Sequence, residues 1–207
     1  MPVIALVGNK GGAGKTTLCV NLACALAKRQ PTIIVDADPQ QSSLQWFRMG
    51  GESASTRVVA GSDDVAGSLA SLDAGMHYRL IDCPPSAQSA QMQQALELAD
   101  LAIVPVLPSP LDIWATVHVE EVVRQARKVN PALKTRLVVN QFESRTRLSK
   151  ATQQALAELE IPAAKTIIRR RAIYRQSLID GRSVHDMGSQ GVDAVNEIQD
   201  LINEIRL

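Results

Sequence analysis

The chain has 207 residues, of which 45% are hydrophobic and 21% are charged, proportions typical of a folded globular domain rather than a disordered chain. No apolar run approaches the roughly 20 residues that a membrane-spanning helix requires, and the first residues lack the basic segment of a signal peptide. Three cysteines without a CxxC pair favour reduced thiols. We therefore expect a cytoplasmic protein with a single domain over residues 1–207.

The formal net charge of +1 at pH 7 hides an uneven distribution. Residues 124–175 carry 13 Lys and Arg against 3 Asp and Glu, whereas residues 1–123 carry 7 against 12 and residues 176–207 carry 2 against 6. If the basic block lies on one face, it forms a surface that attracts polyanions; the alternative is a set of solvated helix faces. An aromatic content of 3% argues against a protein that stacks the bases of single strands.

Short β-branched runs alternate with longer helical stretches along the chain. The pattern predicts strands at 2–8, 32–36, 57–60, 78–82, 101–106, 135–140 and 164–168. It predicts helices at 15–29, 40–48, 63–72, 88–97, 111–129, 147–159, 171–179 and 192–205. Several strands are almost continuously apolar, as strands covered on both faces must be. The expected fold is α/β, with a mostly parallel twisted sheet flanked by helices on both faces.

A glycine-rich segment directly follows the first expected strand and opens a helix. It reads Asn9-Lys10-Gly11-Gly12-Ala13-Gly14-Lys15-Thr16-Thr17. Glycines let backbone N–H groups turn toward phosphate oxygens, and the helix N-terminus adds its dipole. In such a loop Lys15 reaches the β- and γ-phosphates and the Thr16 hydroxyl ligates Mg²⁺. The strict P-loop pattern asks for Gly where this chain has Asn9, so the match departs at one position.

Two other strand ends carry carboxylates. Asp36 and Asp38 follow the second expected strand, and Asp82 ends the fourth. Asp82 is expected to bind the Mg²⁺ shell through water, because hard cations prefer oxygen ligands. The alternative for Asp36 and Asp38 is a purely structural role as turn residues at a strand end.

Taken in order, these segments resemble those of the ParA/MinD family of ATPases, including its small ParF-like members. The resemblance rests on the following segments, in chain order: the deviant Walker A box Lys10–Thr17 with its second lysine, Asp36-Ala37-Asp38-Pro39-Gln40-Gln41-Ser42 (Walker A′ or switch I), Tyr78-Arg79-Leu80-Ile81-Asp82-Cys83-Pro84-Pro85 (Walker B and switch II), Pro105-Val106-Leu107-Pro108-Ser109-Pro110-Leu111-Asp112, Val138-Val139-Asn140 and Gly181-Arg182-Ser183-Val184. It covers essentially the whole chain. It implies a dimer that sandwiches ATP and Mg²⁺, with Asn140 recognising adenine.

The resemblance also assigns roles. Lys10 is the family's signature lysine, which crosses to the partner's phosphates, and a cation added there stabilises the charge that develops in phosphoryl transfer. Asp38 is expected to orient the attacking water and Asp36 to hold waters of the Mg²⁺ shell, although these two roles could be exchanged. The catalytic set is therefore expected to be Lys10, Lys15 and Asp38, with Thr16, Asp36 and Asp82 on the metal side.

Family members divide by what the ATP-bound dimer sits on. The expected last helix has an acidic polar face, which anionic lipid would repel, so we expect no membrane binding. The basic block favours non-specific, salt-dependent DNA binding instead, which would place the protein on the nucleoid. The candidate residues are Arg145, Arg147, Arg169, Arg170 and Arg171. An arginine here could also contact nucleotide or pair across the dimer.

The leading hypothesis is thus an ATPase that moves over DNA and segregates or positions cargo when a ParB-like or cargo-adaptor partner stimulates hydrolysis. The cargo could be a plasmid, a chromosome or a protein compartment such as a carboxysome. The chain length and the Pro-Ser-Pro-Leu-Asp stretch favour the plasmid type slightly, with compartment positioning next. The alternatives are a metabolic ATP-dependent synthetase or amidase of the cobyrinic acid or dethiobiotin type, and a switch that binds nucleotide without hydrolysing it.

Overall fold

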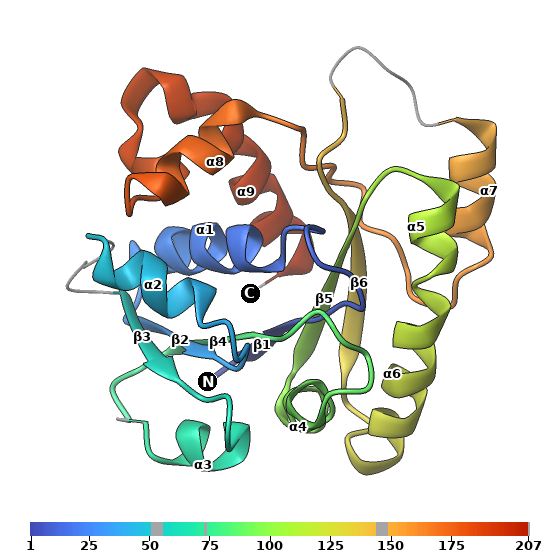
Figure 1. The fold of residues 1–207 in the computed structure, drawn as a ribbon, viewed down its shortest axis with the longest axis horizontal. Helices are drawn as coiled ribbons and strands as arrows, with labels where there is room; N and C mark the ends of the chain where they lie inside the picture. Colours follow the sequence, from blue (N-terminus) through green and yellow to red (C-terminus); the bar gives the residue numbers. More distant parts are fainter. Residues whose placement is uncertain (51–55, 73, 144–148, 207) are drawn as a thin grey trace.

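The structure is a computed structural model that describes residues 1–50, 56–72, 74–143 and 149–206. Its strands form a six-stranded sheet in the order β3-β2-β4-β1-β5-β6 (Figure 1), and every neighbouring pair is parallel. The strands are β1 (Val3–Leu6), β2 (Thr32–Asp36), β3 (Thr56–Ala60), β4 (Tyr78–Asp82), β5 (Leu101–Val106) and β6 (Lys134–Val139). The predicted α/β fold is confirmed.

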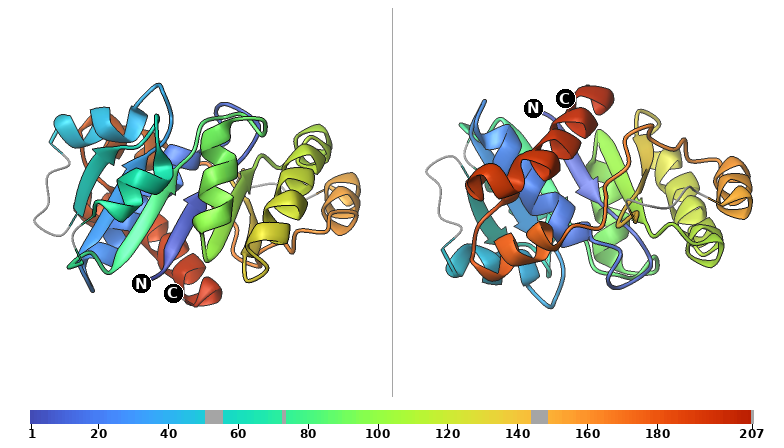
Figure 2. Two further views of the ribbon diagram at one scale, coloured as in Figure 1. Left: turned by 90° about the horizontal axis from the view of Figure 1, so that it is seen from below. Right: turned by 90° about the horizontal axis from the view of Figure 1, so that it is seen from above.

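Helices cover both faces of this sheet, as the three ribbon views show (Figures 1 and 2). One face carries α1 (Lys15–Ala27), α2 (Ser42–Arg48), α8 (Ala172–Ile179) and α9 (Val192–Ile205). The other carries α3 (Val65–Ala70), α4 (Ala90–Leu98) and α6 (Val117–Val129). The short α5 (Pro110–Trp114) lies beside α7 (Lys150–Ala157) beyond the β6 edge, and two 3₁₀ turns, η1 (Val184–Asp186) and η2 (Gly188–Gly191), precede α9.

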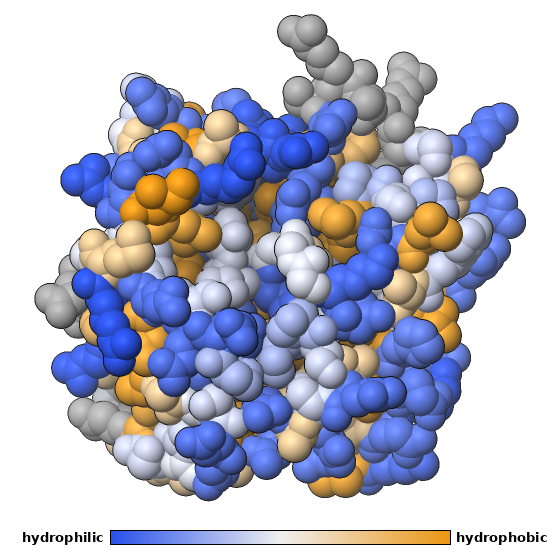
Figure 3. All heavy atoms as spheres, in the orientation of Figure 1, coloured by the Kyte–Doolittle hydropathy of each residue, from blue (hydrophilic) through white to orange (hydrophobic). Residues whose placement is uncertain are grey.

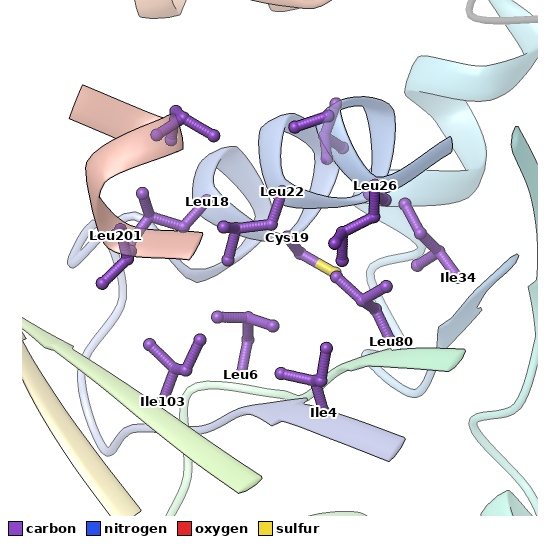
Figure 4. Close-up of a cluster of buried hydrophobic side chains, with 14 of the residues drawn as sticks. Ile4, Leu6, Leu18, Cys19, Leu22, Leu26, Ile34, Leu80, Ile103 and Leu201 are labelled. Carbon is purple, nitrogen blue, oxygen red and sulfur yellow. The ribbon is translucent and has the colours of Figure 1, made fainter. Parts of the chain in front are cut away.

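The strand side chains alternate between two separate cores, which is why the strands are apolar on both faces. Ile4 and Leu6 of β1 pack into the first core with α1, α8 and α9, whereas Ala5 points into the second core with α3, α4 and α6. Figure 4 shows the first core, where Leu18 and Leu22 of α1 face the strands. Covering both faces fixes the sheet and leaves its edges and strand ends for chemistry.

The predicted strand at 164–168 is wrong as a regular strand. This segment follows β6 through two isolated bridges, Leu137 with Ala163 and Phe142 with Arg169, and the N–H groups of Ala164 and Ile168 donate to the carbonyls of Leu137 and Val139. Between these contacts the N–H groups of Lys165 and Thr166 donate instead to the Glu204 carboxylate of α9, at 2.7 and 2.8 Å. A charged acceptor on α9 therefore replaces the ladder at this point.

The predicted helix at 111–129 is two helices, α5 and α6. At the break, the Ala115 carbonyl accepts a 2.6 Å hydrogen bond from Asn9 Nδ2 of the glycine-rich loop. The Thr116 hydroxyl also donates back to the Asp112 carbonyl at 3.2 Å. Side chains thus engage the carbonyls of Asp112 and Ala115 at the break. The second helix, α6, begins after its N-cap Thr116, whose carbonyl accepts from the Val119 N–H.

The apolar stripe of α9 packs in the first core, with Ile198, Leu201 and Ile202 buried. Among the described helices, none combines the length and the hydropathy needed to cross a membrane. On the face drawn in Figure 3, hydrophilic side chains predominate and hydrophobic ones form separate patches.

Candidate nucleotide site at the carboxyl ends of the strands

The glycine-rich loop leads from β1 into α1, and its backbone requires glycine. Gly12 and Gly14 have φ of 76° and 95°, values that L side chains rarely adopt. A Cβ at Gly14 would also lie 2.2 Å from Asn140 Nδ2. Gly14 is the N-cap of α1 and has no side chain to cap that end, so the N–H groups of the first turn can serve as an anion site.

Two neighbouring amide side chains hold this loop from the end of β6. Asn140 Nδ2 donates to the Ala13 carbonyl and Gln141 Nε2 to the Gly12 carbonyl, both at 2.7 Å. Asn140 is buried, and its Oδ1 accepts the Gln141 N–H at 2.9 Å. Asn140 therefore shapes the phosphate loop, and adenine recognition by it stays a prediction. Gln141 was not predicted, and its position next to Asn140 was its only signal in the sequence.

The two lysines of the loop lie in different surroundings. Lys15 is buried, and its Nζ donates to the Lys10 carbonyl at 3.0 Å. Burial lowers the pKa of Lys15, while Asp82 and Asp38 act in the opposite direction. The Lys10 side chain is 43% exposed and forms a 2.5 Å ion pair with Asp112 of α5. Asp112 belonged to a segment that carried the resemblance, but no role was predicted for it.

Asp36 is fully buried at the end of β2, and both of its oxygens bind backbone N–H groups. Oδ1 accepts from Asp38 at 3.2 Å and Oδ2 from Leu44 at 2.9 Å. Burial raises the pKa of Asp36 above its ordinary value, although these two hydrogen bonds act to lower it. Asp36 thus shapes the 38–44 segment, and its place in a Mg²⁺ shell stays a prediction. Asp38 is half-buried, with Oδ1 accepting the Gln40 N–H at 2.9 Å.

Asp82 lies opposite Asp36 in the β2–β4 register and is also fully buried. Its Oδ2 accepts a 2.5 Å hydrogen bond from Ser43, a residue that sequence reasoning missed. Its buried Oδ1 finds no hydrogen-bond partner in the part of the chain that the structure describes. Burial raises the pKa of Asp82 to about 7, although Ser43, Thr16 and Lys15 act to lower it.

An unpaired buried carboxylate oxygen is costly unless something binds it. A hard divalent cation takes oxygen ligands, and the half-buried Thr16 of α1 is close enough to Asp82 to lower the pKa of its carboxyl. The residues present therefore fit Mg²⁺, and the predicted metal roles of Thr16 and Asp82 stay predictions.

A small cavity of about 100 Å³ opens beside the loop, lined by Gly14, Thr17 and Asn140 together with the three consecutive arginines 169–171. Arg171 pairs with Asp193 at 2.7 Å and with Glu197 at 2.9 Å. Its side chain is consequently only 28% exposed.

The other two arginines are more accessible. The Arg170 side chain is 61% exposed and contacts Glu143 at 3.2 Å, and that of Arg169 is 42% exposed, 3.8 Å from Glu197. Arg145 and Arg147 lie outside the described residues. The structure thus places Arg169–Arg171 at the nucleotide side of the molecule, and DNA contact by any of these arginines stays a prediction.

Comparison with known proteins agrees with this geometry. Residues 4–184 match the model of the family described as the CobQ/CobB/MinD/ParA nucleotide binding domain. The chain is 38% identical over 205 residues to the maintenance of carboxysome distribution protein A of Halothiobacillus neapolitanus, covering 98% of this chain and 95% of that protein. It is 33% identical over 196 residues to the protein of the same name from Gloeobacter kilaueensis, covering 88% and 83%.

Among solved structures, the ATP complex of a Cyanothece McdA variant superimposes with a TM-score of 0.74 at 19% identity, over 99% of this chain and 96% of that one. At that identity the likeness shows the fold. The family model and the curated relatives confirm the predicted relationship: the chain belongs to the CobQ/CobB/MinD/ParA nucleotide-binding family.

Proposed function

We propose that this protein is an ATPase that positions a protein compartment of the carboxysome kind, working as an ATP-closed dimer on DNA. The observation that supports a dimer is the position of Lys10, whose side chain is half-exposed and bound to Asp112. Lys15, the other lysine of the loop, is buried. A surface lysine at the start of a phosphate loop is available to the nucleotide of a second copy. The names of the relatives from Halothiobacillus and Gloeobacter favour compartment positioning over plasmid partition, which the sequence placed first.

The chemistry follows from residues of this chain. The N–H groups of the loop and the first turn of α1 bind the phosphates, and Lys15 neutralises their charge in cis. Thr16 and Asp82 hold Mg²⁺, which when bound neutralises phosphate charge. Asp38, at the half-buried end of the 36–38 segment, orients the attacking water. Lys10 of the partner adds a cation at the developing charge, a role like that of an arginine finger, which is worth about 10³-fold or more in rate.

Of the candidate arginines, Arg170 is the first choice for contact with DNA phosphates. It is the most exposed of the three consecutive arginines, whereas Arg171 is committed to two carboxylates of α9. Two copies in a dimer would double the number of phosphate contacts, and binding would weaken with salt because it releases counterions. Arg145 and Arg147 belong to the same proposal.

A metabolic synthetase on this fold is the weaker candidate. It needs a pocket for a second substrate, and the curated relatives from Halothiobacillus and Gloeobacter are carboxysome distribution proteins rather than synthetases. Turnover of a small-molecule acceptor without DNA or a partner would favour it. A non-hydrolysing switch would be indicated if no phosphate were released even with DNA and the partner present.

The test is self-association and DNA binding without nucleotide, with ADP and with a non-hydrolysable ATP analogue, at two salt concentrations. We expect a DNA-binding dimer only with the analogue, weakened by salt and lost in Lys10→Ala. Asp112→Asn, which frees Lys10, should form the dimer at lower analogue concentration. Glu160→Gln is the matched control, because it breaks the exposed Arg124 pair elsewhere on the surface. The proposal would be refuted if dimerisation and DNA binding were the same with and without nucleotide, or if both were unchanged in Lys10→Ala.

A further inference from the structure

A hydrogen bond between Ser43 and Asp82 joins the start of α2 to the end of β4. The two residues are 39 positions apart, both side chains are fully buried, and the Oγ–Oδ2 distance is 2.5 Å. A hydroxyl that donates to a carboxylate at this distance makes a strong, charge-assisted bond. Ser43 is thus placed to fix the carboxylate that faces the proposed cation.

This bond makes the two oxygens of Asp82 unequal. Oδ2 is occupied by Ser43, whereas the buried Oδ1 has no hydrogen-bond partner among the described residues. The terminal torsion of an aspartate is broad and roughly two-fold, so without an anchor the carboxylate can rotate. The Ser43 hydroxyl removes that freedom and leaves Oδ1 as the oxygen available to a cation held by Thr16.

The neighbour of Asp82 increases the need for this donor. Asp36 is paired with Asp82 in the β2–β4 register, and its oxygens already accept from Asp38 and Leu44. Two buried carboxylates side by side repel each other unless each has its own donors. Consecutive residues at the start of α2 supply them: Ser43 binds Asp82 and the Leu44 N–H binds Asp36.

We propose that Ser43 is a positioning residue for the divalent cation: it holds Asp82 through Oδ2 so that Oδ1 faces the metal. The inference rests on the proposed nucleotide function and adds a residue to it. Ser43 does not touch nucleotide; it acts through Asp82. Groups that orient a metal ligand in this way typically contribute about 10- to 100-fold to metal affinity.

The test measures how much Mg²⁺ is needed for a non-hydrolysable ATP analogue to stabilise the full chain against thermal unfolding. Ser43→Ala should raise the half-maximal Mg²⁺ concentration by about tenfold or more, with analogue binding in EDTA unchanged. Ser42→Ala is the matched control: it makes the same change at the adjacent, exposed serine and should keep the wild-type midpoint. If Ser43→Ala does not fold, Ser43→Cys decides by the same midpoint, which should also rise because a thiol donates only a weak hydrogen bond in place of the hydroxyl.

A wild-type Mg²⁺ midpoint in Ser43→Ala or Ser43→Cys, with only a lower unfolding temperature, would show a merely structural serine and overturn the inference alone. No Mg²⁺-dependent stabilisation of the wild-type chain by the analogue would overturn the proposed function and the inference with it. The two failures are therefore distinguishable in one experiment.

Discussion

A substitution at Asn140 can distinguish between two roles for this residue, stabilising the phosphate loop and recognising the adenine base. Its Nδ2 donates to the Ala13 carbonyl at 2.7 Å in a buried position. Asn140→Ala removes this bond and leaves the Ala13 carbonyl without its donor, a cost of about 1–3 kcal/mol for a buried group. For a chain of this size each kcal/mol corresponds to about 2–4 °C in Tm. We expect that loss in the nucleotide-free protein, measured by thermal and denaturant unfolding.

The second half of the assay is binding of ATP and GTP analogues to the same variant. Because Asn140 holds the loop that contacts phosphates, both affinities should fall by the same factor. Gln141→Ala is the comparison, because its bond to the Gly12 carbonyl is exposed and should cost less, about 0.5–1.5 kcal/mol. Unchanged stability without nucleotide, combined with a loss confined to the adenine nucleotide, would refute this reasoning and establish base recognition.

Three further predictions follow from the geometry. Gly14→Ala should destabilise the nucleotide-free protein by at least about 1–2 kcal/mol, because its φ of 95° is left-handed and the new Cβ would meet Asn140; denaturant unfolding measures this. Arg171→Ala should cost about 1.5 kcal/mol of stability by breaking its pairs on α9, whereas Arg170→Ala should leave stability unchanged and reduce the salt slope of DNA binding by about 1. Glu204→Gln should be destabilised at pH 7, and its deficit relative to wild type should disappear as the pH falls below 4.5, in unfolding experiments down to about pH 3.

The sign of the last prediction comes from the direction of the shift. Burial raises the pKa of Glu204, the hydrogen bonds from Lys165 and Thr166 lower it, and the net shift is downward. A lowered pKa gives stability that is present above the unfolded value and lost as the pH falls through the folded one. A deficit that persists at low pH would contradict it.

For the glycine and arginine predictions the controls are internal. Gly11→Ala, where a Cβ meets no atom within 4 Å, should leave the unfolding midpoint at or slightly above that of wild type. An equal loss of stability in Gly11→Ala and Gly14→Ala would contradict the left-handed argument. An Arg170→Ala variant that is as destabilised as Arg171→Ala would show that the exposed ion pair with Glu143 carries more than its geometry indicates.

The sequence by itself determined the α/β fold and the position of the phosphate loop. β-Branched runs encode strands and the glycines encode the left-handed turns, and both are local properties of the chain. The resemblance placed Asp36 and Asp82 on the metal side, and the β2–β4 register of the structure puts the two residues opposite each other. The sequence distinguished Lys10 from Lys15 by their positions in the loop, but it did not predict that one is exposed and the other buried.

Only the tertiary structure decided which groups these residues meet. The Ser43–Asp82 bond spans 39 residues, and the contacts of Lys10 with Asp112 and of Asn9 with Ala115 span 102 and 106. The same kind of contact, from Glu204, interrupts the strand expected at 164–168. Such bonds depend on where two independently packed cores place α2, α5 and α9 around the strand ends, and short sequence patterns carry no information about that placement.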